Sequence, residues 1–309
     1  MRRREFTIGA LLAAMAREVY AQEKPNQHRI AIVIPSGDVS SISDKGTTID
    51  RYSGEARPEG HAELARQVVD GKPDVIVAAN NAVATAARAT TDTIPIVWIG
   101  GDPVEAGFAT SLAHPGGNVT GVTVFAGTEI WGKRLQILKE AVPAASKATY
   151  LTTRVSLAAE GQQLRKASRQ LGIAVIELAL DEVSATAIER AFTEIVQQQS
   201  DAFLVNSNSL LFPYRQLIVG LAEKNRLPAL YPWRDYVEAG GLMAYASDNR
   251  ELWRRMADDV HEILDGAKPG DIPIYQPTKF ELVINLKTAE ALGLKIPPSL
   301  LARADEVIE

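Results

Sequence analysis

The stretch IPIVWIGGDPVEAGFATSLAHPGGNVTGVT, from Ile94 to Thr123, decides the fold class. It opens with a short apolar run, Ile94–Ile99, which is too short for an ordinary helix and too apolar for a strand that faces water. This run predicts a buried parallel strand. Asp102 and Pro103 then stand where the N-cap and the first residue of a helix belong. A strand, a glycine turn and a helix N-terminus together predict a ligand-binding edge at the carboxyl end of a sheet.

The rest of the chain alternates short apolar strands with amphipathic helices, which is typical of α/β proteins with doubly wound sheets. The pattern restarts after Thr123, so we expect two Rossmann-like lobes of similar size. The predicted strands are 29–34, 47–52, 74–78, 94–99, 119–123, 147–152, 174–180, 202–205, 228–231, 242–246 and 280–285. The predicted helices are 59–70, an alanine-rich segment ending at Ala89, 129–142, 158–171, 186–199, 210–224, 250–265 and 286–292.

Composition narrows the function classes. A length of 309 residues, 46% of them hydrophobic, suits two domains with a core each. The formal net charge of −5 argues against a nucleic-acid partner, which favours a basic surface. The absence of cysteine excludes disulfides, thiolate metal sites and a lipidated N-terminal cysteine.

The first 21 residues have the pattern of an export signal. Arg2, Arg3 and Arg4 precede a short apolar core, and the small residues before position 22 fit signal-peptidase cleavage after Ala21. The paired arginines resemble a twin-arginine signal, although the residues after Phe6 depart from it. We expect an exported, periplasmic protein that is not inserted in the membrane after cleavage.

Signatures of catalysis are missing from the sequence. It contains no dinucleotide-binding glycine motif, no phosphate-binding P-loop and no nucleophile elbow. The four histidines are scattered without metal-ligand spacing. We therefore expect no catalytic residues, no metal, no cofactor and no enzymatic activity.

Small polar and aromatic residues follow several of the predicted strands. The carboxyl ends of such strands share one edge of each sheet, so these residues are expected to face a cleft between the lobes. Helix N-termini there suit a carboxylate, Asp102 suits an ammonium group, and the aromatic residues suit a stacking wall. Helix capping and core packing are the plainer interpretations of the same residues. The candidate ligand residues are Pro35, Ser36, Asn80, Asn81, Asp102, Pro103, Val104, Thr153, Asn206, Asn208, Tyr231, Trp233 and Tyr236.

Three motifs resemble one known family. Residues 94–123, YVEAGGLMAYASD (Tyr236–Asp248) and the tail from Pro277 to Glu309 look like those of ABC-transporter substrate-binding proteins. The resemblance implies a type I periplasmic binding protein fold, capture of a small solute, and a membrane permease as partner. Some relatives bind aromatic amino acids. It also implies lobes of 29–124 with 247–274 and of 125–246 with 275–309, joined by a three-segment hinge.

Two other classes of protein share a two-lobed plan. A cytoplasmic ligand-sensing domain would carry a DNA-reading helix pair before the first lobe, and residues 1–28 show only the signal pattern. A two-lobed transferase would carry a phosphate-cradling glycine loop or metal-binding carboxylates, and neither pattern occurs. An amino acid, and an aromatic one in particular, is the best single expectation for the ligand.

The first crossover is unusually short. Parallel neighbours need a connection of a dozen or more residues, usually with a helix, and PSGDVSSISDKGT between Ile34 and Thr48 is too small and polar for one. A single turn over 38–46 is the milder alternative. We expect one face of the first sheet to lack its cover, and the first lobe to be marginally stable, to pair with another chain or to bind its ligand weakly.

Overall fold

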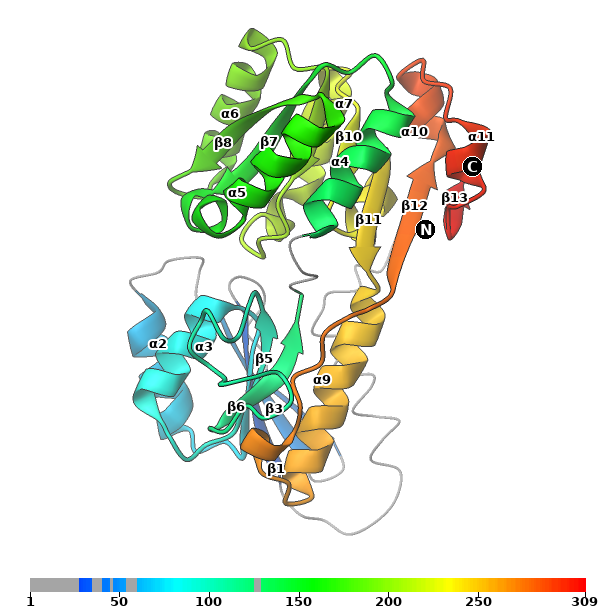
Figure 1. Cartoon of the computed structure of the whole chain (residues 1–309). Helices are drawn as coiled ribbons and strands as arrows, with labels where there is room; N and C mark the ends of the chain where they lie inside the picture. The colour runs from blue at the N-terminus through cyan, green and yellow to red at the C-terminus, as the bar shows by residue number, and fades with distance from the viewer. Residues whose placement is uncertain (1–27, 35–40, 45–46, 54–59, 125–128) are drawn as a thin grey trace. The chain divides into compact units, whose positions relative to one another are not determined.

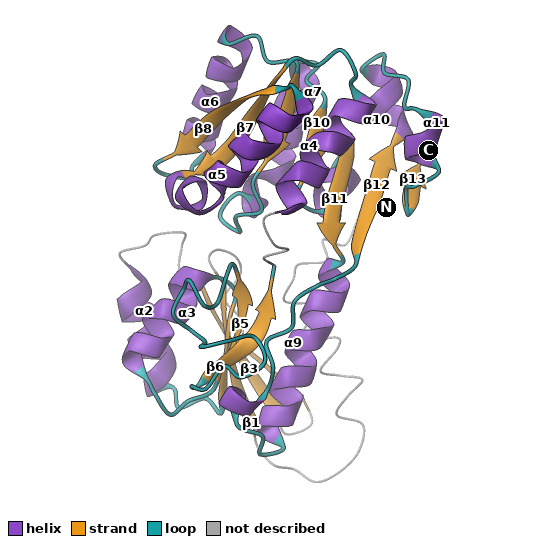
Figure 2. Cartoon of the chain, in the orientation of Figure 1, coloured by secondary structure: helices purple, strands orange, loops and turns teal. Residues whose placement is uncertain are grey.

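The computed structural model describes residues 28–34, 41–44, 47–53, 60–124 and 129–309 (Figure 1). The chain divides into two compact units. Unit 1 takes the described residues within 1–125 and Asn249–Pro277, and unit 2 takes those within 126–248 and Thr278–Glu309. The predicted export signal lies outside the described residues. Helices and strands alternate in both units, as Figure 2 shows, which confirms the α/β class.

Unit 1 is built on a sheet whose described strands have the order β2–β3–β1–β4–β5–β6. Neighbouring strands run parallel except β2 and β3, which are antiparallel. The strands are β1 (His28–Ile34), β2 (Ser41–Asp44), β3 (Thr47–Ser53), β4 (Val75–Ala78), β5 (Ile96–Gly100) and β6 (Val119–Thr123).

Helices cover both faces of this sheet. On one face the cluster around Ala31, Ile76 and Trp98 includes side chains from the first two helices, and on the other the cluster around Ile30 and Val77 includes side chains from the third. The third helix follows most of unit 2 in the sequence, so its return to unit 1 agrees with what the resemblance implies. The helices are α2 (His61–Asp70), α3 (Asn81–Thr90) and α9 (Asn249–Leu264).

The short first crossover contains a strand, where the sequence predicted a turn at most. β2 pairs antiparallel with β3 at the edge of the sheet. The sequence predicted that one face of this sheet lacks cover, and for the described strands this prediction was wrong. Ile30, Ile32 and Ile49 are only 5%, 3% and 7% exposed. On that face β3 presents Ile49 between Thr47 and Arg51, so only one large apolar side chain of the strand needs cover.

Unit 2 is built on a sheet whose described strands have the order β13–β12–β11–β10–β9–β7–β8. β11 and β12 are antiparallel, and the other neighbouring pairs are parallel. The strands are β7 (Lys147–Thr153), β8 (Ala174–Leu180), β9 (Ala202–Val205), β10 (Ala229–Tyr231), β11 (Met243–Ser247), β12 (Phe280–Asn285) and β13 (Glu306–Ile308).

Two apolar layers enclose the sheet of unit 2. The cluster around Leu135 and Tyr150 joins one face to α4, α5, α10 and α11, and the cluster around Phe192 and Phe203 joins the other to α6, α7 and α8. A short 3₁₀ turn, η2 (Phe212–Tyr214), leads into α7, and another, η3 (Pro269–Asp271), follows α9 in unit 1. The helices are α4 (Glu129–Ala141), α5 (Arg154–Leu171), α6 (Ala185–Gln197), α7 (Arg215–Lys224), α8 (Arg234–Glu238), α10 (Leu286–Ala291) and α11 (Pro298–Leu301).

Candidate functional site

The predicted ligand residues fall into two groups, one at the strand ends of each unit. Pro35 and Ser36 lie outside the described residues. Unit 1 holds Asn80, Asn81 and the segment 102–104, and the remaining candidates belong to unit 2.

Asn80 caps α3 directly after β4. Its side-chain oxygen accepts a hydrogen bond from the backbone N–H of Val83 at 2.8 Å, and its backbone is extended, with φ at −166°. The side chain is 8% exposed. The cap satisfies one of the N–H groups that the first turn of a helix leaves without a partner. Asn80 therefore has a structural role, and its contact with a ligand stays a prediction.

Asn81 begins α3, and its amide has a fixed orientation. The side-chain oxygen accepts hydrogen bonds from Nε1 of Trp98 at 3.0 Å and from the backbone N–H of Gly101 at 3.1 Å. Both groups can only donate, so the oxygen must face them and Nδ2 must point the other way. Among the described residues none accepts a hydrogen bond from this Nδ2. The half-buried Asn81 thus offers two N–H donors at the N-terminus of a helix, where the helix dipole favours an anion.

Close packing around Trp98 supports this orientation. Trp98 is fully buried and meets the ring of Phe108 edge-on at 5.4 Å. Gly121 of β6 has φ at +132°, and a Cβ atom there would lie 2.5 Å from the backbone nitrogen of Trp98. A Cβ atom at Gly100 would lie 2.5 Å from the Nε1 atom that donates to Asn81. Both glycines are needed, because a side chain at Gly100 would displace the indole and one at Gly121 would displace the backbone of Trp98.

Asp102 opens a turn and not the helix that the sequence predicted. Its carboxylate oxygen accepts hydrogen bonds from the backbone N–H groups of Val104 at 2.8 Å and Glu105 at 3.1 Å. Gly107, with φ at +71°, ends this single turn before a helix can form. Pro103 is buried, and Val104 is 50% exposed. Asp102 therefore caps a local turn, and its contact with a ligand ammonium group stays a prediction.

In unit 2, Thr153 and Asn208 join two strand ends. Thr153 is the last residue of β7 and caps α5 by accepting a hydrogen bond from the N–H of Ser156. The helix begins four residues earlier than predicted. Nδ2 of Asn208 donates to the hydroxyls of Thr153 at 3.2 Å and Ser156 at 3.1 Å. The Asn208 side-chain oxygen accepts from the N–H of Leu210 at 2.9 Å. The loop after β9 is thereby fixed to the start of α5.

Asn206 belongs to a buried hydrogen-bond network. Its Nδ2 donates to a carboxylate oxygen of Glu160 at 2.7 Å and to the hydroxyl of Tyr150, and that hydroxyl donates to the same Glu160 oxygen at 2.8 Å. Asn206 is 2% exposed. Burial, with a contribution from the Glu160 charge, raises the pKa of the Tyr150 phenol well above its usual range. The network stabilises the junction of β7, α5 and β9.

Arg134 of α4 joins the middle of β11 to the loops after β9 and β10. Its Nε donates to the backbone oxygen of Tyr245 at 3.1 Å, one Nη donates to the hydroxyl of Ser207 at 3.1 Å, and the other donates to the backbone oxygen of Pro232 at 3.5 Å. The guanidinium lies 5.0 Å from the ring centre of Trp131. Burial lowers the pKa of Arg134 to about 10, so the group stays charged at neutral pH. The loops after β9 and β10 are thus held by one buried cation.

The candidate aromatic residues form a cluster inside unit 2. Tyr231 and Tyr236 stack, with ring centres 5.1 Å apart and an interplanar angle of 16°, and Trp233 meets Phe212 edge-on at 5.3 Å. Tyr231, Trp233 and Tyr236 are 1%, 8% and 0% exposed. The sequence was right to group these rings, but packing in the core engages them. Contact between them and a ligand stays a prediction.

Sequence reasoning missed Arg134, Glu160 and Ser156. A signal for Arg134 was available, because it lies three residues after Trp131 and one before Leu135, on the apolar stripe of its helix. A charged residue at such a position needs buried partners. Thr153, which belongs to a residue type favoured at helix N-caps, could have marked the start of α5. Nothing in the sequence indicated which acceptors would meet Arg134.

Nowhere in the described ranges do three or more histidine, aspartate or glutamate side chains gather closely enough to hold a metal ion. None of the helices described is both long and apolar enough to cross a membrane.

Comparison with known proteins identifies the family. The family model for "ABC transporter substrate binding protein" matches residues 37–308. A tyrosine-binding protein of Clostridioides difficile is 26% identical over 268 residues, which cover 84% of this chain and 76% of the relative. A conserved domain protein of Vibrio cholerae has a TM-score of 0.81 at 24% identity, covering 91% of this chain and 99% of that one. An ABC domain of Streptococcus pneumonia in complex with L-Trp has a TM-score of 0.80 at 23% identity, covering 91% of this chain and 100% of that one. Since the family match covers residues 37–308 of a chain of 309, this chain belongs to the ABC transporter substrate-binding protein family.

Proposed function

We propose that this chain captures an aromatic amino acid in the periplasm and delivers it to the membrane permease of an ABC importer. Proteins of this family bind small solutes, are not enzymes and are typically found outside the cytoplasm. Membership of the family specifies neither the solute, nor the direction of transport, nor the compartment, and these three points are what we propose.

The orientation of the Asn81 amide is the observation that carries the choice of ligand. Two obligate donors hold its oxygen, so Nδ2 offers hydrogen-bond donors where α3 begins. The backbone N–H groups of the first helical turn add partial positive charge at the same place. A carboxylate is the group that matches both features, and a free amino acid carries one. Asp102, in the turn after β5, supplies a carboxylate for the amino group.

The relatives support an aromatic side chain on that amino acid. One is described as a tyrosine-binding protein and another was solved with L-Trp. In unit 2, Thr153, Asn208 and Trp233 lie at the carboxyl ends of strands, and the hydrogen bonds from Arg134 fix two of those loops. We propose that the solute contacts these strand ends as well as Asn81, with Trp233 as its apolar contact.

A thermal-shift comparison of matched solutes tests this function. L-tyrosine, L-tryptophan and L-phenylalanine are compared with L-tyrosinamide, which lacks the carboxylate charge. A ligand at 100 times its Kd stabilises the native state by about 2.7 kcal/mol, so a rise in Tm of several degrees is expected for at least one aromatic amino acid. Tyrosinamide should give little or no shift. The proposal fails if sugars or aliphatic solutes raise Tm and no aromatic amino acid does.

Export is tested separately, by N-terminal sequencing of protein recovered from the periplasm. The proposed signal predicts a chain that starts at Gln22 after cleavage behind Ala21. Recovery of the full chain with Met1 from the cytoplasm alone would overturn the periplasmic assignment. It would leave the solute-binding part of the proposal intact.

A further inference from the structure

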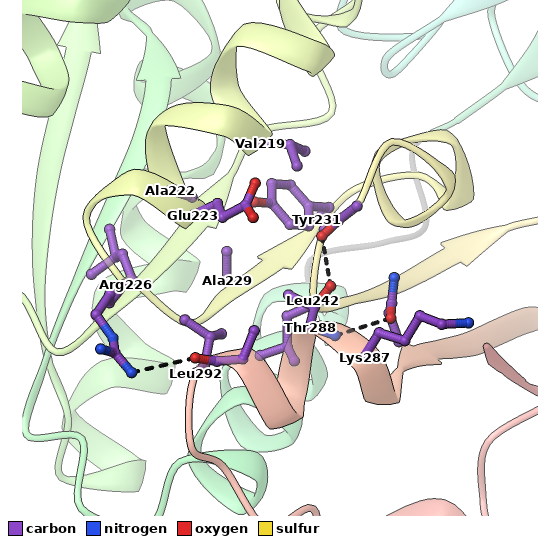
Figure 3. A pocket seen from close by; sticks show the side chains of 15 residues that line it. Val219, Ala222, Glu223, Arg226, Ala229, Tyr231, Leu242, Lys287, Thr288 and Leu292 are labelled. Atoms are coloured by element: carbon purple, nitrogen blue, oxygen red, sulfur yellow. Dashed lines mark hydrogen bonds between the residues drawn. The ribbon is translucent and has the colours of Figure 1, made fainter. Parts of the chain in front are cut away.

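Unit 2 has a pocket at the other end of its sheet from the candidate ligand loops. It lies between α7 and α10, over the amino ends of β10 and β11, and has a volume of about 300 Å³ (Figure 3). Such a volume is in the range of small-molecule sites. Asn206 and Asn208, in contrast, follow the carboxyl end of β9. The pocket is therefore separate from the strand ends proposed to bind the transported solute.

The floor of the pocket is apolar. Ala222 of α7, Ala229 of β10 and Leu242 are each 1–2% exposed, and the ring of Tyr231 completes the surface. Stacking on Tyr236 fixes the Tyr231 ring from its other side. Covering this apolar surface with the apolar part of a ligand removes it from water, which favours binding.

Two polar groups that border this floor donate a hydrogen bond to none of the described residues. Asn285 is 7% exposed, and its side-chain oxygen caps α10 by accepting a hydrogen bond from the N–H of Thr288 at 3.1 Å. That bond turns Nδ2 of Asn285 away from the helix, and none of the described residues accepts from it. The Tyr231 hydroxyl, on a side chain 1% exposed, likewise has no hydrogen-bond partner in the described part of the chain. Both groups can donate a hydrogen bond to a ligand in the pocket.

Two basic side chains and one carboxylate line the rim, and of these charges the Glu223 carboxylate acts on the Tyr231 ring of the floor. Arg226 donates to the backbone oxygen of Ala291 at 3.3 Å, and Lys287 donates to the backbone oxygen of Glu309. Glu223 has no ion-pair partner among the described residues, and Figure 3 shows its carboxylate beside the ring of Tyr231. Burial, and next the charge of Glu223, raise the pKa of the Tyr231 phenol, in agreement with that proximity.

We propose that this pocket is a second binding site, for a small organic ammonium ion with an apolar body. The ammonium group faces Glu223, the body covers the floor around Tyr231, and a hydrogen-bond acceptor on the ligand takes the Asn285 N–H. An aromatic amine with a hydroxyl group at its far end has all three parts. Nothing in this assignment depends on the identity of the transported solute.

Titration with tyramine, followed by NMR or calorimetry, tests the proposal on the whole chain. We expect saturable binding to the wild type. Glu223→Gln should weaken it by about fivefold, the effect of one partly exposed ion pair. Glu189→Gln, which removes an equivalent exposed carboxylate on α6, is the matched control and should bind as the wild type does.

Two further variants separate the pocket from the strand ends. Ala222→Leu fills the floor and should weaken tyramine binding more than tenfold, and Asn81→Asp should leave it unchanged. Circular dichroism establishes that each variant is folded, and Glu223→Gln tests the site if Ala222→Leu is not. The proposal is overturned by the absence of saturable binding, by equal affinities of the Glu223 and Glu189 variants, or by loss of binding in Asn81→Asp.

Discussion

Replacing Asn81 by aspartate isolates the proposed ligand contact from the fold. The two side chains have nearly the same shape, and a carboxylate oxygen still accepts from Trp98 Nε1 and from the N–H of Gly101. The Nδ2 donors are replaced by a second, negatively charged oxygen. A negative charge in the first turn of α3 also interacts favourably with the helix dipole, by about 0.3–1 kcal/mol. The protein without ligand should therefore be as stable as the wild type, or slightly more stable.

Ligand affinity should change in the opposite direction. Loss of a hydrogen bond to a charged group costs about 1.5–3 kcal/mol. Two carboxylates about 4 Å apart repel each other by up to about 4 kcal/mol at an effective dielectric constant of 20, and partial exposure reduces this value. A total of about 3–5 kcal/mol corresponds to a Kd raised by two to three orders of magnitude or more.

Calorimetric titration with L-tyrosine or L-tryptophan measures this change, and a thermal melt without ligand measures stability. Gln162→Glu, an exposed substitution on α5 with the same change of net charge, is the control and should bind as the wild type does. A Kd for Asn81→Asp within about threefold of the wild type would refute the reasoning that Nδ2 meets a ligand carboxylate. A large loss of stability without ligand would refute the account of the amide orientation.

Three further predictions concern residues in the interior of one unit or the other. Arg134→Met leaves its buried acceptors unpaired, so urea denaturation should show a loss of about 2–4 kcal/mol, and a change below 0.5 kcal/mol would contradict the role given to Arg134. Gly121→Ala should lower the free energy of unfolding by about 2–4 kcal/mol, because its Cβ would strike Trp98. Gly172→Ala, with φ at +62° and open space around it, should lower it by only about 1–2 kcal/mol. Equal losses of stability would contradict the packing argument. Burial, and then the neighbouring charges, raise the pKa of Asp259 to about 7, so the folded state holds a proton that the unfolded state loses above about pH 4. Stability should therefore fall as pH rises from about 4 to 7. Asp259→Asn should be more stable than the wild type by about 2–4 kcal/mol at pH 8 but not at pH 4, as urea denaturation at the two pH values would measure.

The fold was largely predictable because most of its strands are buried in the middle of a sheet. Segments such as Val75–Ala78 and Ala202–Val205 are continuous apolar runs, and every residue in them is buried. Edge strands carry a weaker signal, since one side of the strand lacks a neighbour. The sequence analysis missed the edge strands β2 and β13, which have only four and three residues, although it predicted the longer edge strands β6 and β8. The return of α9 to unit 1 followed from the family resemblance and not from any periodicity.

The candidate site was less predictable, because polar residues at strand ends have several roles with the same sequence signal. Asn80 and Asn81 are neighbours, yet the first caps α3 and the second is held by Trp98. Asp102 carried a helix-start pattern, but Gly107 limits that segment to one turn. The partners of Arg134 lie 73 to 111 residues away in the chain. Pairings over such separations depend on sheet order, which local patterns do not specify.

A crystal structure of the protein with bound L-tyrosine or L-tryptophan tests the central claim most directly. The account predicts a ligand carboxylate oxygen within hydrogen-bond distance of Asn81 Nδ2, at the N-terminus of α3, with the Asn81 side-chain oxygen still on Trp98 Nε1. A ligand bound elsewhere, with water alone on Nδ2, would contradict it.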